Sequence, residues 1–260
     1  MNLDDITVLI ISYNEAPNLA RTLDALRGMP RVLVLDSGSD DGTEAIARGY
    51  GNVHWYMRAF DDFAAQCNHG LSLIDTSWVL SLDADHVLEA DFVSELMNLD
   101  GAAQGYATGF RYCVNGVPLR ASLLPPRTVL FRRAAGRYVN DGHAHRIVVP
   151  GPVPQLRARI RHDDRKPLSR WLANQERYAR HEVAKLRASG QTLGLADRIR
   201  RWRWLAPPLV FAYTLFVRGT VFDGWRGWHY AYQRAVAEAV LAMRLIEADW
   251  SGAQRSEPPR

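Results

Sequence analysis

Cysteine is scarce in this 260-residue chain: the two present, Cys67 and Cys113, lie far apart and lack metal-ligand spacing. Their scarcity excludes a disulfide-rich scaffold and suits a reducing compartment, although two cysteines can still form one disulfide. A membrane-spanning run is also missing, because the apolar stretch 204–217 has 14 residues and two prolines and about 20 are needed to cross a bilayer. The acidic start MNLDD leads directly into apolar residues, so we expect no secretory signal. These absences predict a protein of the cytosol or of the cytosolic face of a membrane.

Lysine is absent from the first hundred residues, which carry 5 arginines against 17 acidic residues, a net charge of −12. Residues 101–260 carry 27 basic and 11 acidic residues, a net charge of +16. Such asymmetry indicates two electrostatic roles, with an acidic half suited to metal binding and a basic half suited to an anionic surface. The alternative is an unevenly charged but merely solvated surface.

Short apolar runs alternate with amphipathic segments over the first hundred residues. Helical spacing is found in Leu19, Leu23 and Leu26, and again from Phe60 to Leu71. The resulting βαβαβαβ order predicts an open, mostly parallel sheet that binds ligands at the carboxyl ends of its strands. The four predicted strands are 6–11, 32–35, 53–57 and 78–82.

The pattern changes after residue 104. Alternating apolar residues from Tyr106 to Val114 reach an Asn115-Gly116 turn, which predicts a hairpin, and 156–161 reads as a strand with arginines on one face. From Leu168 onward the sequence is typical of helices. No internal repeat is visible. We therefore expect a catalytic domain at 1–165 and a helical extension at 166–260.

Two carboxylates two residues apart, Asp83 and Asp85 in SLDAD, end the fourth predicted strand. Their mutual repulsion is relieved by a divalent cation such as Mg²⁺ or Mn²⁺, which can bridge to a diphosphate. In group transfer such a cation neutralises charge on a departing nucleotide. A lone pair of this kind is common in surface turns, but its position at a strand end favours a metal site.

Polar loops also follow the first two strands. Ser12-Tyr13-Asn14-Glu15 offers a ring that can stack on a base and groups that can hydrogen-bond a nucleotide, and Asp36 in LDSGSDDGT can accept from a base or a ribose. The structural alternatives are a helix cap at Asn14 and an ordinary polar turn after Asp36. Three such loops at successive carboxyl ends favour the nucleotide site.

The motifs IISYNE, VLDSGSDDGT and WVLSLDAD, with RAFDDFAAQCNHGL before the third and HDDRKPLSRWLANQERYARHE further on, resemble the family 2 glycosyltransferases. They are similar to those of bacterial enzymes that add a hexose to lipopolysaccharide cores or surface glycans. The resemblance implies a GT-A-like, Rossmann-type nucleotide-diphospho-sugar transferase fold, an inverting reaction and a donor such as a UDP-sugar. It further implies nucleotide binding by Ser12, Tyr13, Glu15, Asp36 and Asp83, with Asp85 as metal ligand.

The chain departs from that family pattern at two places. The more common Asp-Asp after the second strand is Asp36-Ser37, which leaves one carboxylate, and Gln66-Cys67-Asn68 stands where many relatives have Ala-Arg-Asn. Arg58, or an arginine of the basic half, is a candidate to replace the missing phosphate ligand.

A catalytic base is expected further along the chain. The stretch 138–145 contains Asp141, His143 and His145 around a glycine, and His162-Asp163-Asp164 forms a second cluster. We predict Asp141 as the base, with Asp163 and Asp164 as rivals, because inversion needs a carboxylate on the acceptor side. His143 and His145 are predicted to help Asp85 bind the metal, since imidazole also ligates Mn²⁺. Each histidine taken alone is more typical of a surface loop.

The segment 198–228 is rich in arginine and tryptophan. It suits either an interfacial segment on anionic lipid or a helical pair packed on the domain or on a second subunit, so a homo-oligomer stays open. We expect a divalent metal, a nucleotide-sugar donor, a glycan or glycolipid acceptor and peripheral contact with the inner face of the cell membrane. Nucleic acid is not an expected partner. The alternatives are a sugar-1-phosphate nucleotidyltransferase, disfavoured by the lack of a Gly-rich phosphate loop with lysine, and a non-catalytic membrane scaffold.

Overall fold

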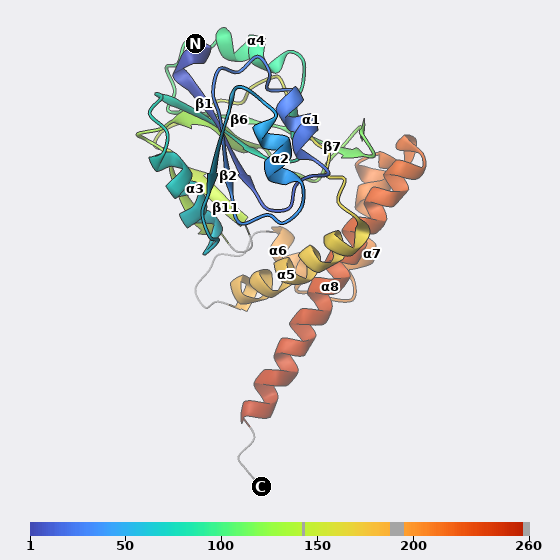
Figure 1. Cartoon of the computed structure of the whole chain (residues 1–260). Coiled ribbons are helices and arrows are strands. Elements are labelled where there is room, and N and C mark those ends of the chain that lie inside the picture. The colour runs from blue at the N-terminus through green and yellow to red at the C-terminus, as the bar shows by residue number, and fades with distance from the viewer. Residues whose placement is uncertain (142–143, 188–194, 257–260) are drawn as a thin grey trace. The chain divides into compact units, whose positions relative to one another are not determined.

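The structure, a computed structural model, describes residues 1–141, 144–187 and 195–256, without the side chains of 141, 144, 145, 195, 196 and 251–256 (Figure 1). Its chain divides into two compact units. The first comprises 1–118 and 122–166, and the second comprises 119–121 and 167–260.

The first unit is built on a six-stranded sheet with the order β3-β2-β1-β4-β9-β6. β1, β2, β3 and β4 pair in parallel, and β9 joins β4 in the antiparallel sense. The mostly parallel α/β sheet expected from the sequence is confirmed. The strands are β1 (Ile6–Ser12), β2 (Val32–Asp36), β3 (Val53–Met57), β4 (Trp78–Asp83), β6 (Gly105–Thr108) and β9 (Arg127–Arg132).

Helices cover both faces of this sheet, which explains the nearly continuous apolar runs of β1 and β2. In β1, Val8 packs with helix α1 on one face and Leu9 packs with α3 on the other, where Figure 1 shows the two helices on opposite sides of the sheet. A side chain at Gly70 would approach Leu9 Cδ1 to 2.7 Å, so glycine at this α3 position avoids displacing a core side chain. The helices of this unit are α1 (Leu19–Asp24), α2 (Thr43–Arg48), α3 (Phe63–Ser72) and α4 (Phe92–Met97), after a 3₁₀ turn at Leu3–Asp5.

The alternating run 106–114 is divided between two sheets. β6 ends at Thr108, and after Gly109 the chain enters a second sheet with the order β5-β12-β7-β8. The hairpin expected at Asn115-Gly116 is present, and both turn residues have positive φ, 51° and 79°. The second sheet consists of β5 (His86–Leu88), β7 (Phe110–Val114), β8 (Val117–Pro118) and β12 (Ile160–His162).

The arginine-bearing strand is shorter than expected, although its alternation is correct. Leu156, Ala158 and Ile160 are buried and the arginines between them are exposed. Part of its backbone bonds to a side chain, because Glu95 accepts from the N–H groups of Arg157 and Ala158 at 2.9 and 2.7 Å. Nearby in the chain, β10 (Arg137–Asp141) and β11 (Ala144–Val148) form an antiparallel pair that the sequence pattern did not indicate.

The second unit is helical, as the sequence predicts. α5 and α8 share an apolar cluster formed by Ala179, Leu186, Leu241 and Leu245. In the ranges the structure describes, none of the helices combines the length and apolarity needed to cross a membrane. The elements are α5 (Leu168–Arg187), α6 (Leu195–Arg200), α7 (Ala206–Ala212), a π-helical turn η2 (Tyr213–Val217), a 3₁₀ turn η3 (Thr220–Asp223) and α8 (Trp225–Ser256).

Candidate active site

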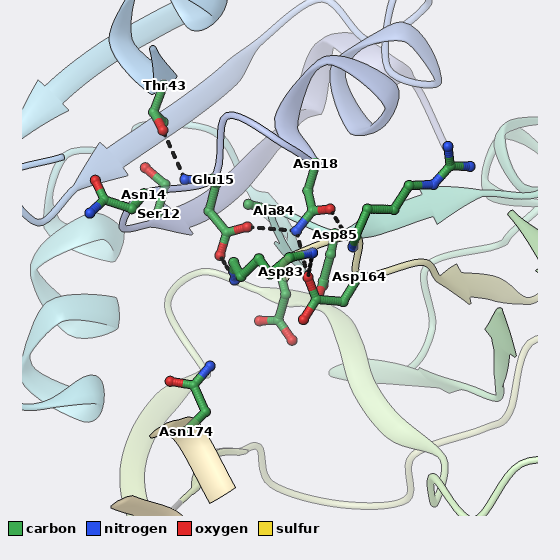
Figure 2. Close-up of polar contacts among 12 residues, drawn as sticks. Ser12, Asn14, Glu15, Asn18, Thr43, Asp83, Ala84, Asp85, Asp164 and Asn174 are labelled. Atoms are coloured by element: carbon green, nitrogen blue, oxygen red, sulfur yellow. Dashed lines mark hydrogen bonds and ion pairs between the residues drawn. The ribbon is translucent and has the colours of Figure 1, made fainter. Parts of the chain in front are cut away.

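The loops after β1 and β2 are joined by hydrogen bonds. The N–H of Asn14 donates to Ser39 Oγ at 2.7 Å. The N–H of Glu15 donates to Thr43 Oγ1 at 2.8 Å, as Figure 2 shows. Asn14 itself has a positive φ of 54°, and α1 begins only at Leu19, so the interpretation of Asn14 as a helix cap is wrong. Both loops are therefore held together at the carboxyl edge of the sheet, where the sequence predicts a nucleotide site.

Asp36 ends β2 with a carboxylate that is 1% exposed. Its Oδ2 accepts from the hydroxyls of Ser12 and Ser39 at 2.7 and 2.6 Å, and its Oδ1 accepts from the N–H groups of Gly38 and Ser39. Asp36 thus fixes the turn, and its role toward a nucleotide stays a prediction. The side chain of Tyr13, at the same edge, is half exposed.

The Asp83–Asp85 turn is anchored from two sides. The carbonyl of buried Ala84 accepts from Thr22 Oγ1 of α1 at 2.8 Å, and the carbonyl of Asp85 accepts from the N–H of Asp163 at 3.0 Å. The side chain of Asp83 is 41% exposed, whereas that of Asp85 is nearly buried. The two carboxylates therefore occupy different surroundings, and Asp85 is the one directed into the protein.

Asp85 lies beside two histidines that the second sheet brings together. β5 and β12 place His86 opposite His162, and Asp85 Oδ1 lies 3.9 Å from His86 Nε2 and 3.6 Å from His162 Nδ1. All three atoms are buried without a hydrogen-bond partner, and they lie within 4.8 Å of one another. Buried polar atoms are normally paired, so this convergence fits a site for a divalent cation.

His86 is suited to orienting the carboxylates. Burial lowers the pKa of His86 to about 4, against the opposing effect of Asp83 and Asp85, so the ring is neutral at pH 7. Its Nδ1 accepts from the N–H of Asp83 at 3.0 Å, which puts the proton on Nε2, 3.3 Å from Asp83 Oδ2. The lone pairs left for a cation are then those of Asp85 Oδ1 and His162 Nδ1.

Glu15 and Lys166 form a largely buried ion pair close to this cluster. Burial raises the pKa of Glu15 to about 7, although the ammonium of Lys166 opposes the shift. Asn18 connects the pair to the segment that follows β12, because its amide donates to Glu15 Oε2 at 2.9 Å and to Asp164 Oδ1 at 2.8 Å (Figure 2). The network places one cation of the basic half next to the acidic edge of the sheet.

The two rival bases differ in their contacts. Asp163 is 5% exposed, and its carboxylate accepts from the N–H of Gly116 and pairs with Arg21 and Arg165. It therefore supports the β7–β8 turn. Asp164 Oδ1 accepts from Asn18 and from the N–H of Lys166.

Three predicted residues cannot be placed in the site. Asp141 ends the backbone of β10, but its side chain lies outside the described structure, as does that of His145 in β11. His143 lies outside the described residues altogether. The expected roles of all three stay predictions. His86 was missed by the sequence analysis although it follows the carboxylate pair directly, and His162 was not singled out from its cluster.

Arg58, the candidate replacement for a phosphate ligand, is engaged elsewhere. Its guanidinium pairs with Asp61 at 2.6 Å and donates to Gln66 Oε1. Arg127 lies beside the carboxylate pair, with Nη1 3.9 Å from Asp83 Oδ2. Lys166, one of two lysines in the chain, was a signal that the sequence analysis overlooked.

Comparison with known proteins agrees with this geometry. The chain is 24% identical over 259 residues to the lipopolysaccharide core biosynthesis glycosyltransferase LpsC of Rhizobium meliloti (strain 1021), covering 93% of this chain and 92% of LpsC. Its fold is similar to that of the mannosyltransferase PcManGT from Pyrobaculum calidifontis in complex with GDP-Man and Mn²⁺, at 15% identity and a TM-score of 0.53, covering 93% and 87% of the two chains.

The family assignment rests on the greater part of the first unit. The sequence model of glycosyl transferase family 2 matches residues 7–162, which include the loops after β1, β2 and β4 and the two histidines beside Asp85. The mostly parallel sheet with C-terminal helices is the GT-A-like fold that the sequence predicts. The family match therefore disfavours both alternatives, a sugar-1-phosphate nucleotidyltransferase and a non-catalytic scaffold. The chain belongs to glycosyl transferase family 2 and is a glycosyltransferase.

Proposed function

We propose that the enzyme transfers a hexose from a nucleoside diphosphate sugar, a UDP-sugar, to a hydroxyl group of a lipopolysaccharide, lipid-linked or other surface-glycan acceptor, with inversion. The observation that carries the proposal is the convergence of buried, unpaired Asp85 and His162 atoms beside the nucleotide-side loops. Similarity to LpsC supports the acceptor class. The mannosyltransferase holds a guanosine nucleotide, so the choice of uridine rests on the resemblance of the motifs.

In this proposal the nucleotide lies across the loops after β1 and β2. Tyr13 is exposed and can stack on the base, while Ser12 and Asp36 shape the turn that receives the base or ribose. Asp83 points to the exposed side, where it can accept from a ribose or sugar hydroxyl. Glu15 completes the nucleotide pocket and is held in place by its ion pair with Lys166.

The metal would be held by Asp85 and His162, with His86 fixing the orientation of the carboxylates and any role of His143 and His145 still to be tested. When bound, a divalent cation neutralises negative charge on the departing nucleotide. Asp85 and His162 can hold the cation with little reorganisation, because their free atoms are buried and already face one another.

Lys166 is proposed as the second cation for the leaving group. Its ammonium is largely buried, lies next to Glu15 and is near enough to Asp85 for their charges to interact. In an otherwise acidic edge of the sheet, it is positioned to attract a diphosphate. Arg58 is less suited because Asp61 and Gln66 already occupy its guanidinium.

Asp141 remains the proposed base. Inversion needs a carboxylate opposite the leaving group to accept the proton of the attacking hydroxyl. Asp163 is a weaker candidate, because its buried carboxylate is engaged by a backbone N–H and two arginines. Asp164 stays as the rival, with Oδ1 bonded to Asn18.

The second unit is proposed to contact an anionic membrane. Phe216, Val217, Phe222 and Trp225 are mostly exposed around the turn between α7 and α8. Residues 198–237 contain seven arginines and one acidic residue, Asp223, which pairs with Arg120 at 3.5 Å within the same unit. Exposed aromatic and apolar groups next to arginines suit the interface of an anionic bilayer.

The arginines nearest the start of this segment are engaged within the unit. Arg200 pairs with Glu182 at 3.0 Å and with Glu238 at 3.3 Å, and Arg203 pairs with Asp249. Lipid contact is therefore assigned to the turn between α7 and α8 rather than to the whole of 198–203. This assignment narrows the proposed lipid contact to one part of the segment 198–228.

The test of the proposed reaction is UDP binding with and without Mn²⁺, together with transfer from a panel of UDP-hexoses. Asp85→Asn should abolish transfer and the Mn²⁺-dependent part of UDP binding. Asp91→Asn, an exposed carboxylate of the same region, is the matched control and should change neither. Full transfer in EDTA, or in Asp85→Asn, would falsify the metal assignment.

A further inference from the structure

A small cavity lies at the end of β4, on the side of that strand away from β1. It is lined by Asp83, Phe110, Arg127, Tyr138 and Arg146, and it has a volume of about 50 Å³. The nucleotide-side loops follow β1 and β2, whereas this cavity adjoins β9 and β11. It shares Asp83 with the proposed nucleotide site but lies on the other side of β4 from the loops after β1 and β2.

The position of the cavity matches the acceptor side of the reaction. β11 contributes Arg146, which lies opposite Val139 of β10, and β10 ends at the proposed base, Asp141. The same hairpin thus carries a cavity-lining arginine and the base. The volume is enough for a few waters or for a substituent of a few heavy atoms, since about 10–15 Å³ of such a volume holds one water.

The charge of the lining selects the chemistry of that substituent. Among the side chains that line the cavity, two guanidinium groups, of Arg127 and Arg146, face one carboxylate, that of Asp83. Arg127 lies 5.2 Å above the ring of Phe110, which restrains its guanidinium, and 3.9 Å from Asp83. Among the lining side chains that the structure describes, one positive charge remains uncompensated.

We propose that this cavity binds an anionic group of the acceptor, a phosphate or a carboxylate, with Arg127 and Arg146 as its ligands. Guanidinium groups bind both anions through paired, charge-assisted hydrogen bonds, which also fix orientation. The inference rests on the proposed glycosyl transfer and adds to it a class of acceptor, a sugar that carries a negative charge next to the accepting unit. The anion orients the acceptor hydroxyl on the β10 side of β4, and neutral acceptors lack this contact.

The experiment compares glucose 6-phosphate, glucuronate and glucose as probes, titrated into the full chain with saturating UDP and Mg²⁺ and followed by NMR. At least one of the two anionic sugars should bind about tenfold more tightly than glucose, equivalent to about 1.4 kcal/mol. The two anionic arms distinguish a phosphate site from a carboxylate site. Arg127→Gln and Arg146→Gln should each remove the preference.

The control is Arg137→Gln, an exposed arginine at the opposite end of β10, which should keep the preference for the anionic sugar. Arg146 is exposed, so its substitution tests the site even if Arg127→Gln lowers stability. Equal binding of the three sugars, no binding of either anion, or a preference unchanged in both variants overturns the inference. UDP binding in the same samples reports on the proposed function separately, since its loss contradicts glycosyl transfer itself.

Discussion

The two histidines beside Asp85 should respond differently to substitution, although both lie in the same cluster. His162 offers a free Nδ1, 3.6 Å from Asp85 Oδ1, whereas both nitrogens of His86 face Asp83. Losing an orienting partner of a metal ligand costs about 10–100-fold in metal affinity. At 1.4 kcal/mol per tenfold, that range is about 1.4–2.8 kcal/mol for His86→Asn.

His162→Asn should cost more than about 100-fold, the upper end of the range for an orienting residue. The reason is that this substitution removes one of the two proposed metal ligands and leaves Asp85 Oδ1 as the other. The assay is titration of Mn²⁺ into UDP-bound protein, with free Mn²⁺ measured by electron paramagnetic resonance. Circular dichroism of both variants controls for folding.

The reasoning is refuted if His86→Asn loses more Mn²⁺ affinity than His162→Asn. That order would mean that His86 Nε2 is the ligand and that its hydrogen bond with the Asp83 N–H breaks on binding. Equal losses would remove the distinction between a ligand and an orienting residue.

Four further predictions follow from other parts of the molecule. Asp141→Asn should lower turnover by roughly 10²–10⁴ while UDP affinity persists, and near-normal turnover in a rapid-quench assay would move the role to Asp164. Lys166→Met should weaken UDP binding by calorimetry, with partial recovery in Lys166→Arg, and unchanged affinity would contradict its role toward the diphosphate. Phe222 and Trp225 changed together to Ser should reduce sedimentation with anionic vesicles, and the idea fails if the wild type ignores such vesicles at low salt. Burial lowers the folded-state pKa of His86 from 6.5 to about 4, so its contribution to stability is present above pH 6.5 and is lost as the pH falls toward 4. In thermal melts over that pH range, His86→Asn should therefore lose less stability than the wild type.

The sequence by itself determined the main sheet and the edge where chemistry occurs. Apolar runs in β1 and β2 must be covered on both faces, and the alternation of strands with amphipathic segments leaves a parallel order as the solution. Because the carboxyl ends of parallel strands meet at one edge of the sheet, Asp36 and Asp83 had to lie at the same edge. These inferences need only local patterns and the rule that consecutive units pack side by side.

Only the tertiary structure decided which distant residues meet Asp85. His162 reaches it because β12 pairs with β5, and Lys166 reaches Glu15 across 151 residues of sequence. Neither strand is longer than three residues, so periodicity gives no signal for their pairing. Periodicity also gave no sign that 106–114 is divided between two sheets, because a chain can turn at one glycine without changing its apolar alternation. Long-range pairing depends on the packing of the whole unit, and local sequence patterns do not report it.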